Sequence, residues 1–284
     1  MKFFLMSLLL LTAPLESTAE SDQLVVKKDG EPVHTIDRQA YAFSFFINET
    51  KLDQLLDELD KKVYKNPVDA KLNDKEEITS GKPGKALDRQ AFNLAFRKFV
   101  YQGDPTEMEL PVKRIYPRVD SELLSEISEQ EIGSYVTYFK KNNKERTHNI
   151  KLASDAIDSH VVFPGETFSF NKIVGKRTEE KGYKRAPVIV KGELAEDIGG
   201  GICQTSSTLY NAIDLKGIEI VERYSHSRSV PYVPSGRDAT VSWWGPDFSF
   251  KNKLHQPILI RAKAANGKMK INIYSSVDAG KKDS

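Results

Sequence analysis

A cysteine, a histidine and an aspartate follow one another in the second half of the chain, in positions that suit nucleophilic chemistry. Cys203 is the only cysteine among 284 residues and follows the glycines 199–201 after one intervening residue, Ile202. Glycines let the backbone turn sharply, and the hydroxyl-rich run after Cys203 predicts a helix that begins near the cysteine. The partial positive charge at a helix N-terminus favours a thiolate, and neighbouring N–H groups are then placed to stabilise an oxyanion. Cys203 is therefore the candidate nucleophile.

His226 lies near the end of a predicted strand, and Asp238 follows the next proline-rich turn. This order fits the general plan of papain-like and transglutaminase-like enzymes, in which thiolate, imidazole and carboxylate meet in a line of hydrogen bonds. We therefore predict Cys203 as nucleophile, His226 as general base and Asp238 as the residue that orients the imidazole. Asp247 is the alternative orienting residue. The competing interpretation is that Cys203 is a small buried hydrophobe and His226 a packing residue.

Candidate substrate-binding residues lie close in sequence to Cys203, His226 and Asp238. Arg228 and Arg237 carry a fixed charge and planar donors suited to a carboxylate, although ion pairs with Glu222 or Asp197 would also explain them. Trp243 and Trp244 are expected in the core rather than at a sugar-stacking surface. The glycine turn and the helix after it supply the remaining candidates, which are Gly200, Gly201, Gln204 and Ser206.

The charge balance argues against several classes of partner and cofactor. The chain has 42 Lys and Arg residues against 40 Asp and Glu residues, without a basic block, so no nucleic acid is expected as a partner. Five scattered histidines and one cysteine have no metal-ligand spacing. We therefore expect no metal site and no cofactor.

The N-terminus has the pattern of a secretory signal peptide over residues 1–19. Lys2 precedes an apolar run that is shorter than the roughly 20 residues of a membrane span, and small residues at 17–19 suit cleavage. No cysteine follows, which excludes a lipoprotein anchor, so the protein is peripheral to the membrane at most unless the signal stays as an uncleaved anchor. Because secreted proteins use cysteines mainly in pairs, a lone thiol is either buried or kept for its chemistry.

Hydrophobic periodicity predicts an α+β protein with two parts. A small α+β module over 45–118 carries two amphipathic helices, capped by Asn48 or Thr50 and by Asp88. It follows a hairpin segment over 20–44. A linker helix over 119–131 leads to the larger domain over 132–275, where a helix capped by Thr147 and a final hairpin across Asn266 are expected. A mainly antiparallel sheet would pack on the cysteine-bearing helix, and a polar tail covers 276–284.

The first module resembles a peptidoglycan-binding domain that precedes catalytic domains in exported cell-wall proteins, including L,D-transpeptidases. The segments that carry the resemblance are NPVDA (66–70), TSGKPGK (79–85) and ELPV (109–112). The resemblance implies peptidoglycan as the partner. A spacer without affinity for glycan is the alternative.

The larger domain resembles the VanW family, which is named from an accessory gene of a vancomycin-resistance cluster. The segments that carry this resemblance are FPGETFSFN (163–171), GGGICQTSSTLYN (199–211), HSR (226–228) and GRDATV (236–241). Some VanW domains are implicated as cysteine-dependent L,D-transpeptidases that make 3-3 peptidoglycan cross-links. The Ser-His-Gly-Cys type of motif of the better-known L,D-transpeptidase fold is absent, so a shared reaction would use another scaffold.

The resemblance implies an exported protein of the cell wall or the extracytoplasmic face of the membrane. Cys203 would attack a carbonyl of a peptidoglycan stem peptide and form a thioester, which passes to an amine or to water. The alternatives are a non-catalytic peptidoglycan-binding or scaffold protein, and a papain-like cysteine peptidase of the cell wall.

Overall fold

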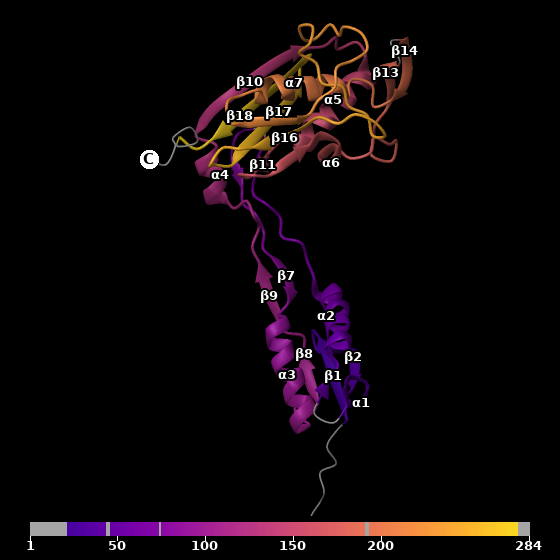
Figure 1. The fold of residues 1–284 in the computed structure, drawn as a ribbon, viewed down its shortest axis with the longest axis vertical. Coiled ribbons are helices and arrows are strands. Elements are labelled where there is room, and N and C mark those ends of the chain that lie inside the picture. Colours follow the sequence, from indigo (N-terminus) through magenta and orange to yellow (C-terminus); the bar gives the residue numbers. More distant parts are fainter. Residues whose placement is uncertain (1–21, 44–45, 74, 191–192, 278–284) are drawn as a thin grey trace, which may run out of the picture. The chain divides into compact units, whose positions relative to one another are not determined.

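The computed structural model describes residues 22–43, 46–73, 75–190 and 193–277, which divide into two compact units (Figure 1). The first unit comprises 22–67 and 83–116, and the second comprises 68–82 and 117–277. Helices and strands occur in both units, which confirms the predicted α+β class. The predicted signal peptide over 1–19 and all but the first two residues of the predicted polar tail lie outside the described residues.

The first unit is a small sheet with two helices whose apolar faces share one core. Strand β1 (Gln23–Lys28) pairs antiparallel with β2 (Glu31–Asp37) and parallel with β8 (Glu107–Glu109). Helices α2 (Glu49–Val63) and α3 (Arg89–Gln102) bury their leucine and phenylalanine faces, and Asn48 and Asp88 cap them as predicted. The other elements of this unit are α1 (Arg38–Tyr41), β3 (Ala42–Phe43), β4 (Phe46–Ile47), β7 (Gly84–Leu87) and β9 (Val112–Ile115).

The boundaries of the first unit differ from the sequence expectation in two places. The hairpin expected as a separate segment over 20–44 belongs to this unit, because β1 bonds to β8 and buries Leu24 and Val26 in the same core. Strands β5 (Lys71–Leu72) and β6 (Ile78–Thr79) belong to the second unit instead, where Leu72 packs in a small cluster with Leu124. Alternating apolar residues indicate a half-buried strand, but they do not say in which core it is buried.

The second unit is built on a four-stranded antiparallel sheet in the order β10-β18-β17-β11. Helices α5 (Lys144–Ile157) and α7 (Ile202–Ile213) pack on this sheet (Figure 1). The last hairpin turns at Asn266 and Gly267 as predicted. The cap of α5 is Asn143 rather than the predicted Thr147, because the Asn143 side chain accepts the N–H of Arg146 at 2.9 Å. The strands are β10 (Gln130–Tyr138), β11 (His160–Val162), β17 (Ile258–Ala265) and β18 (Lys268–Ser275).

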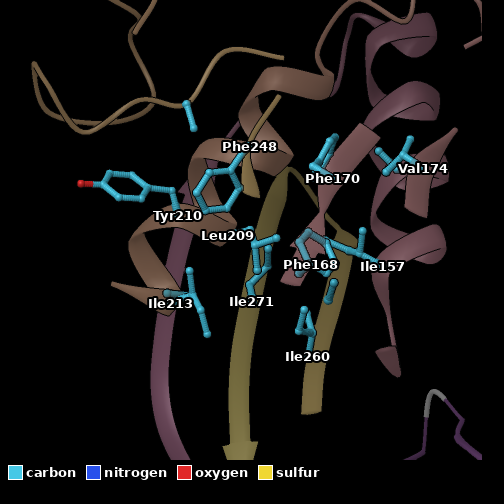
Figure 2. Close-up of a cluster of buried hydrophobic side chains, with 14 of the residues drawn as sticks. Ile157, Phe168, Phe170, Val174, Leu209, Tyr210, Ile213, Phe248, Ile260 and Ile271 are labelled. Carbon is cyan, nitrogen blue, oxygen red and sulfur yellow. The ribbon is translucent and has the colours of Figure 1, made fainter. Parts of the chain in front are cut away.

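A smaller sheet of the second unit, in the order β12-β16-β15, joins the same core. Phe168 and Phe250 stack with ring centroids 4.9 Å apart. Both belong to one buried cluster with Leu209 of α7 and Ile271 of β18; Phe168, Leu209 and Ile271 are labelled in Figure 2. This packing fixes α7, and with it Cys203, against both sheets. The elements are β12 (Thr167–Ser169), β15 (Ile218–Glu222), β16 (Ser249–Asn252), the hairpin β13 (Arg185–Val190) and β14 (Glu193–Ile198), and the short helices α4 (Ser121–Ile127) and α6 (Phe170–Val174).

Among the described residues, no helix combines the length and the apolar character needed to cross a membrane.

Candidate active site

Cys203 is the second residue of α7, and the glycine turn before it sets how the helix begins. Gly201 is the N-cap residue with φ of 105°, a left-handed conformation that favours glycine. A Cβ on Gly200 would lie 2.4 Å from the Ala186 carbonyl oxygen, so the turn is also closely packed. Ile202 and Gln204 donate their N–H groups to Gly199 and Gly201, whereas no acceptor for the Cys203 N–H occurs in the described part of the chain. This N–H is therefore available beside the thiol.

The thiol of Cys203 is half-buried against the segment that follows β15. Its Sγ atom lies 3.5 Å from the Val241 carbonyl oxygen and 3.8 Å from the Thr240 hydroxyl. Within this segment, residues 224–240 form a loop whose two ends are joined by a β-bridge. Thr240 donates its N–H to the Tyr224 carbonyl at 2.8 Å. The segment thereby carries His226 and Asp238 to the N-terminus of α7.

His226 and Asp238 form a buried pair. The Nδ1 atom of His226 lies 2.6 Å from Oδ2 of Asp238, and the side chains are only 6% and 9% exposed. The same carboxylate oxygen accepts the backbone N–H of His226 at 2.6 Å. Because Nδ1 is used by the carboxylate, Nε2 is the ring nitrogen left for proton transfer.

Electrostatics shift Cys203 towards the thiolate and His226 towards the imidazolium. Burial raises the pKa of Cys203, but the His226 imidazole, together with smaller contributions from Val241 and Thr240, outweighs burial and holds the pKa below its ordinary value. Burial lowers the pKa of His226, whereas the thiol and Asp238 raise it, and the net direction is upward. For Asp238, burial raises the pKa, but its bonds with His226 hold it below the ordinary range. All three shifts have the directions that an activated cysteine requires.

Cys203 and His226 line a cavity of about 1310 Å³ in the second unit. Its walls come from the start of α5, the residues after α6, the glycine turn and the segment after β15. The lining includes cationic, phenolic and indole side chains, which are Tyr138, Lys140, Arg146, Lys176, Arg177, Tyr232, Trp243 and Trp244. A space of this size accommodates a peptide-sized ligand.

The structure separates the predicted binding residues of the glycine turn and α7 into two groups. Gly201 and Gln204 line the cavity. Gly200 and Ser206 are buried elsewhere: the Gly200 carbonyl accepts Asn149 Nδ2 at 3.0 Å, and Ser206 Oγ donates to the Ala239 carbonyl at 2.6 Å. Their positions suit a role in holding the turn and the helix rather than a substrate.

The predicted arginine ligands Arg228 and Arg237 do not line the cavity. Arg237 instead forms an ion pair with Asp214 at 2.6 Å and donates to Asn211 Oδ1 at 2.8 Å. The ion pair therefore involves neither Glu222 nor Asp197, the partners considered from the sequence. The sequence could not distinguish these arginines from cavity residues, because charge alone does not say which way a side chain points.

The alternative orienting residue, Asp247, has a different position from Asp238. It accepts the N–H of Asn171 at 2.8 Å and the hydroxyl of Ser169 at 2.5 Å, and so ties its loop to α6. The structure places Asp238, and not Asp247, against His226.

Four cavity residues were missed or misplaced by sequence reasoning. Trp243 and Trp244 were expected in the core, which is wrong, because they are 38% and 84% exposed and both line the cavity. Arg146 and Arg177 had no sequence signal beyond their charge, yet both line the cavity.

In the described part of the chain, no group of three or more His, Cys, Asp or Glu side chains is arranged to hold a metal ion.

Comparisons with known proteins place the two parts of the chain in described families. The family model "VanW like protein" matches residues 145–274, and the model "Putative peptidoglycan binding domain" matches residues 25–109. The second match includes most of the hairpin that was expected outside the module. No solved structure is significantly similar to the chain.

Two curated proteins are similar in sequence. The "Uncharacterized protein YoaR" of Bacillus subtilis (strain 168) is 53% identical over 273 residues, which cover 95% of this chain and 89% of the relative. The "Vancomycin B-type resistance protein VanW" of Enterococcus faecalis (strain ATCC 700802 / V583) is 31% identical over 114 residues, which cover 38% of this chain and 42% of the relative. The chain belongs to the VanW family.

Proposed function

We propose that this protein is an exported cell-wall enzyme in which Cys203 forms a thioester with a peptidoglycan stem peptide and passes the acyl group to an amine. The observation that carries this proposal is that Cys203 and His226 meet at one wall of a large cavity, with Asp238 bonded to the far side of the His226 ring. Cysteine acyl transferases and peptidases use a catalytic triad of thiolate, imidazole and carboxylate, linked in this order.

The reaction begins with attack of the thiolate on an amide carbonyl of the donor stem. The C–N bond breaks, and the imidazolium of His226 gives its proton to the leaving amine, which produces a thioester and a neutral imidazole. An amine of a second stem then attacks the thioester, His226 takes a proton from it, and the C–S bond breaks to restore the thiolate. Asp238 holds the imidazole and stabilises its charged form.

The oxyanion of each step needs donors close to the thiol. The Cys203 N–H has no acceptor among the described residues, and it lies at the positive end of α7. An N–H that is already oriented costs little reorganisation when negative charge develops on the carbonyl oxygen.

The cellular setting rests on the two family matches. A VanW-like domain joined to a module matched by a peptidoglycan-binding family indicates a cell-wall-associated protein. We infer that peptidoglycan is the partner, that the first unit retains the protein on it, and that residues 1–19 direct export. With water as acceptor, the same residues would act as a carboxypeptidase or endopeptidase, so the acceptor is part of the test.

The test is intact mass spectrometry of the protein incubated with a disaccharide-tetrapeptide, with Cys203→Ala as the control. We expect an added mass on the parent protein that equals the acyl part of the donor, and none on the variant. Adding an amine acceptor should then release either a cross-linked product or, if water is the acceptor, the hydrolysed stem. An unmodified parent protein with a thiol that reacts slowly with iodoacetamide would identify a wall-binding protein with a structural cysteine.

A further inference from the structure

Arg177 is a cavity residue whose terminal guanidinium nitrogens have no hydrogen-bond acceptor among the described residues. It lies between α6 and β13, and its Nη1 and Nη2 atoms are buried without a hydrogen-bond acceptor in the described part of the chain. Its stem packs on the glycine turn, since Cβ and Cγ each lie 3.2 Å from where a Cβ on Gly199 would be. The guanidinium lies over the Phe170 ring, with Cζ 5.9 Å from the centroid. The side chain is therefore held in place while its head group is unpaired.

An unpaired buried guanidinium is unusual. Burial lowers the pKa of Arg177, and the groups that favour its charged form are Cys203, Tyr183 and Asp247. Arginine nevertheless keeps its charge in proteins, so its donors need acceptors. Leaving such donors unsatisfied in a buried place is unfavourable, and it is explained when a ligand supplies the missing acceptors.

A second guanidinium approaches the same turn from α5. Arg146 would touch a Cβ on Gly201 through its Cγ, and its Nη2 atom donates to Gln204 Oε1 at 2.7 Å. Gln204 is fixed in turn by donating to Thr137 Oγ1 at 2.9 Å and to the Tyr138 carbonyl at 3.0 Å. Cys203 is among the charged groups that act on Arg146, as it is for Arg177. Both arginines therefore lie within electrostatic reach of the nucleophile.

The charged side chains that line the cavity have a net positive charge. Besides His226, its lining has four basic side chains, Lys140, Arg146, Lys176 and Arg177, and two acidic ones, Glu145 and Asp197. A low-dielectric cleft with a surplus of one charge attracts ligands of the opposite charge.

We propose that Arg177, assisted by Arg146, binds a carboxylate of the substrate, so that the acyl donor is a peptide with a free carboxylate close to the carbonyl that Cys203 attacks. A guanidinium has the planar fork of donors that pairs with both oxygens of a carboxylate. This subsite deepens the proposed function and rests on it for the role of Cys203, but binding of the carboxylate can be tested without any reaction.

The experiment uses the full chain with Cys203→Ala, which cannot form a thioester, and follows the intrinsic fluorescence of Trp243 and Trp244. These are the only two tryptophans of the chain, and both line the cavity. The ligands are a stem tetrapeptide with all carboxylates free, the same peptide as its C-terminal amide, and the same peptide with its side-chain carboxylate amidated. The last two show which carboxylate is bound.

We expect one of the two amides to bind about 10- to 100-fold more weakly than the free acid, as loss of a charged hydrogen-bond partner predicts. Adding Arg177→Gln should weaken binding of the free acid by a similar factor and remove the discrimination between acid and amide. Arg177→Lys should restore part of it. The matched control is Arg185→Gln, an exposed arginine outside the cavity that donates to the Glu196 carbonyl.

Thermal melting separates binding from a structural role. Because the terminal nitrogens of Arg177 have no hydrogen-bond acceptor among the described residues, Arg177→Gln should leave the melting temperature unchanged or raise it, and should abolish the rise caused by the free-acid peptide. Equal binding of acid and both amides, no binding of the acid, or free-acid binding by Arg177→Gln equal to that of its parent would overturn the subsite.

The subsite and the reaction can fail separately. Discrimination between acid and amide without any adduct on the unmodified protein would leave the subsite standing and refute the acyl transfer. An adduct that forms equally from the acid and both amides would support the acyl transfer and refute the carboxylate subsite.

Discussion

Oδ2 of Asp238 lies 2.6 Å from both the Nδ1 atom and the backbone nitrogen of His226, so one carboxylate oxygen fixes the ring and the main chain of the histidine together. The ring therefore has little freedom to turn, and its second nitrogen is the one that can serve Cys203. A histidine fixed in this way keeps the tautomer that proton transfer requires.

Removing the imidazole should make the thiol less reactive at neutral pH. In His226→Asn the burial that raises the pKa of Cys203 persists, while the contact that lowers it is lost. The midpoint of iodoacetamide labelling should move to higher pH, and the rate at pH 7 should fall about tenfold for each unit by which the midpoint rises above pH 7. His255→Asn, an exposed histidine, is the control and should label like the parent. An unchanged pH profile in His226→Asn would mean that the imidazole does not act on the thiol.

Asp238→Asn should cost stability in a defined pH window. The folded pKa of Asp238 lies below its ordinary value, so its stabilising effect is present above about pH 4 and is lost as the pH falls through the folded pKa. The folded pKa of His226 is raised, so its contribution is complete below about pH 6.5 and is lost as the pH rises through the folded pKa. The difference in free energy of unfolding between parent and variant should therefore be largest between about pH 4 and 6.5.

Urea denaturation at several pH values from 3 to 9 measures this difference. Asp155→Asn serves as the control, because it removes an exposed carboxylate that pairs with the exposed Lys151 at 2.6 Å. A difference for Asp238→Asn that is constant across this range would contradict the charged pair.

Gly201→Ala should destabilise the second unit more than Gly236→Ala. Both glycines have positive φ, 105° and 75°, so alanine is strained at each. Only at Gly201 would the new Cβ also meet a side chain, 2.7 Å from Arg146 Cγ, whereas nothing lies within 4 Å at Gly236. We expect losses of about 1 kcal/mol for Gly236→Ala and about 2–3 kcal/mol for Gly201→Ala in chemical denaturation. Equal losses of unfolding free energy would show that the Arg146 side chain moves away from the new Cβ without a cost in stability.

Arg237→Gln should affect stability and not ligand binding. Arg237 and Arg223 lie over the ring of Tyr210, with Cζ 4.6 and 4.5 Å from its centroid, and Arg223 also donates to the Asp238 carbonyl at 2.8 Å. Loss of an exposed ion pair and a cation–π contact predicts a decrease of about 1–2 kcal/mol.

In the Cys203→Ala background, Arg237→Gln should bind the free-acid peptide with unchanged affinity in the tryptophan titration. Weaker binding without a loss of stability would instead make Arg237 the substrate ligand expected from its charge alone.

Local sequence signals predicted the elements that carry the site. The period of the leucines and phenylalanines predicted α2 and α3, and the side chains of Asn48 and Asp88 supplied their caps. Glycines before a helical pattern predicted that Cys203 lies at the start of α7. Each of these depends on residues within one or two turns of each other, so the sequence alone contains the necessary information.

Long-range pairings were not predictable in the same way. The pairing of β1 with β8 and the burial of Leu72 in the second unit join segments far apart in the chain. The alternating pattern of a strand is the same whichever partner it has, so the domain boundaries over 20–44 and 68–82 could not be placed from it.

The sequence by itself determined the family, the α+β class and the order of a thiol, an imidazole and a carboxylate, because these follow from residue types and local spacing. The tertiary structure alone decided that Asp238 rather than Asp247 meets His226, and that Arg146 and Arg177 rather than Arg228 and Arg237 line the cavity. All four arginines carry the same charge in the sequence. What distinguishes them is their packing on the glycine turn, which places Arg146 and Arg177 among the residues that line the cavity with Cys203.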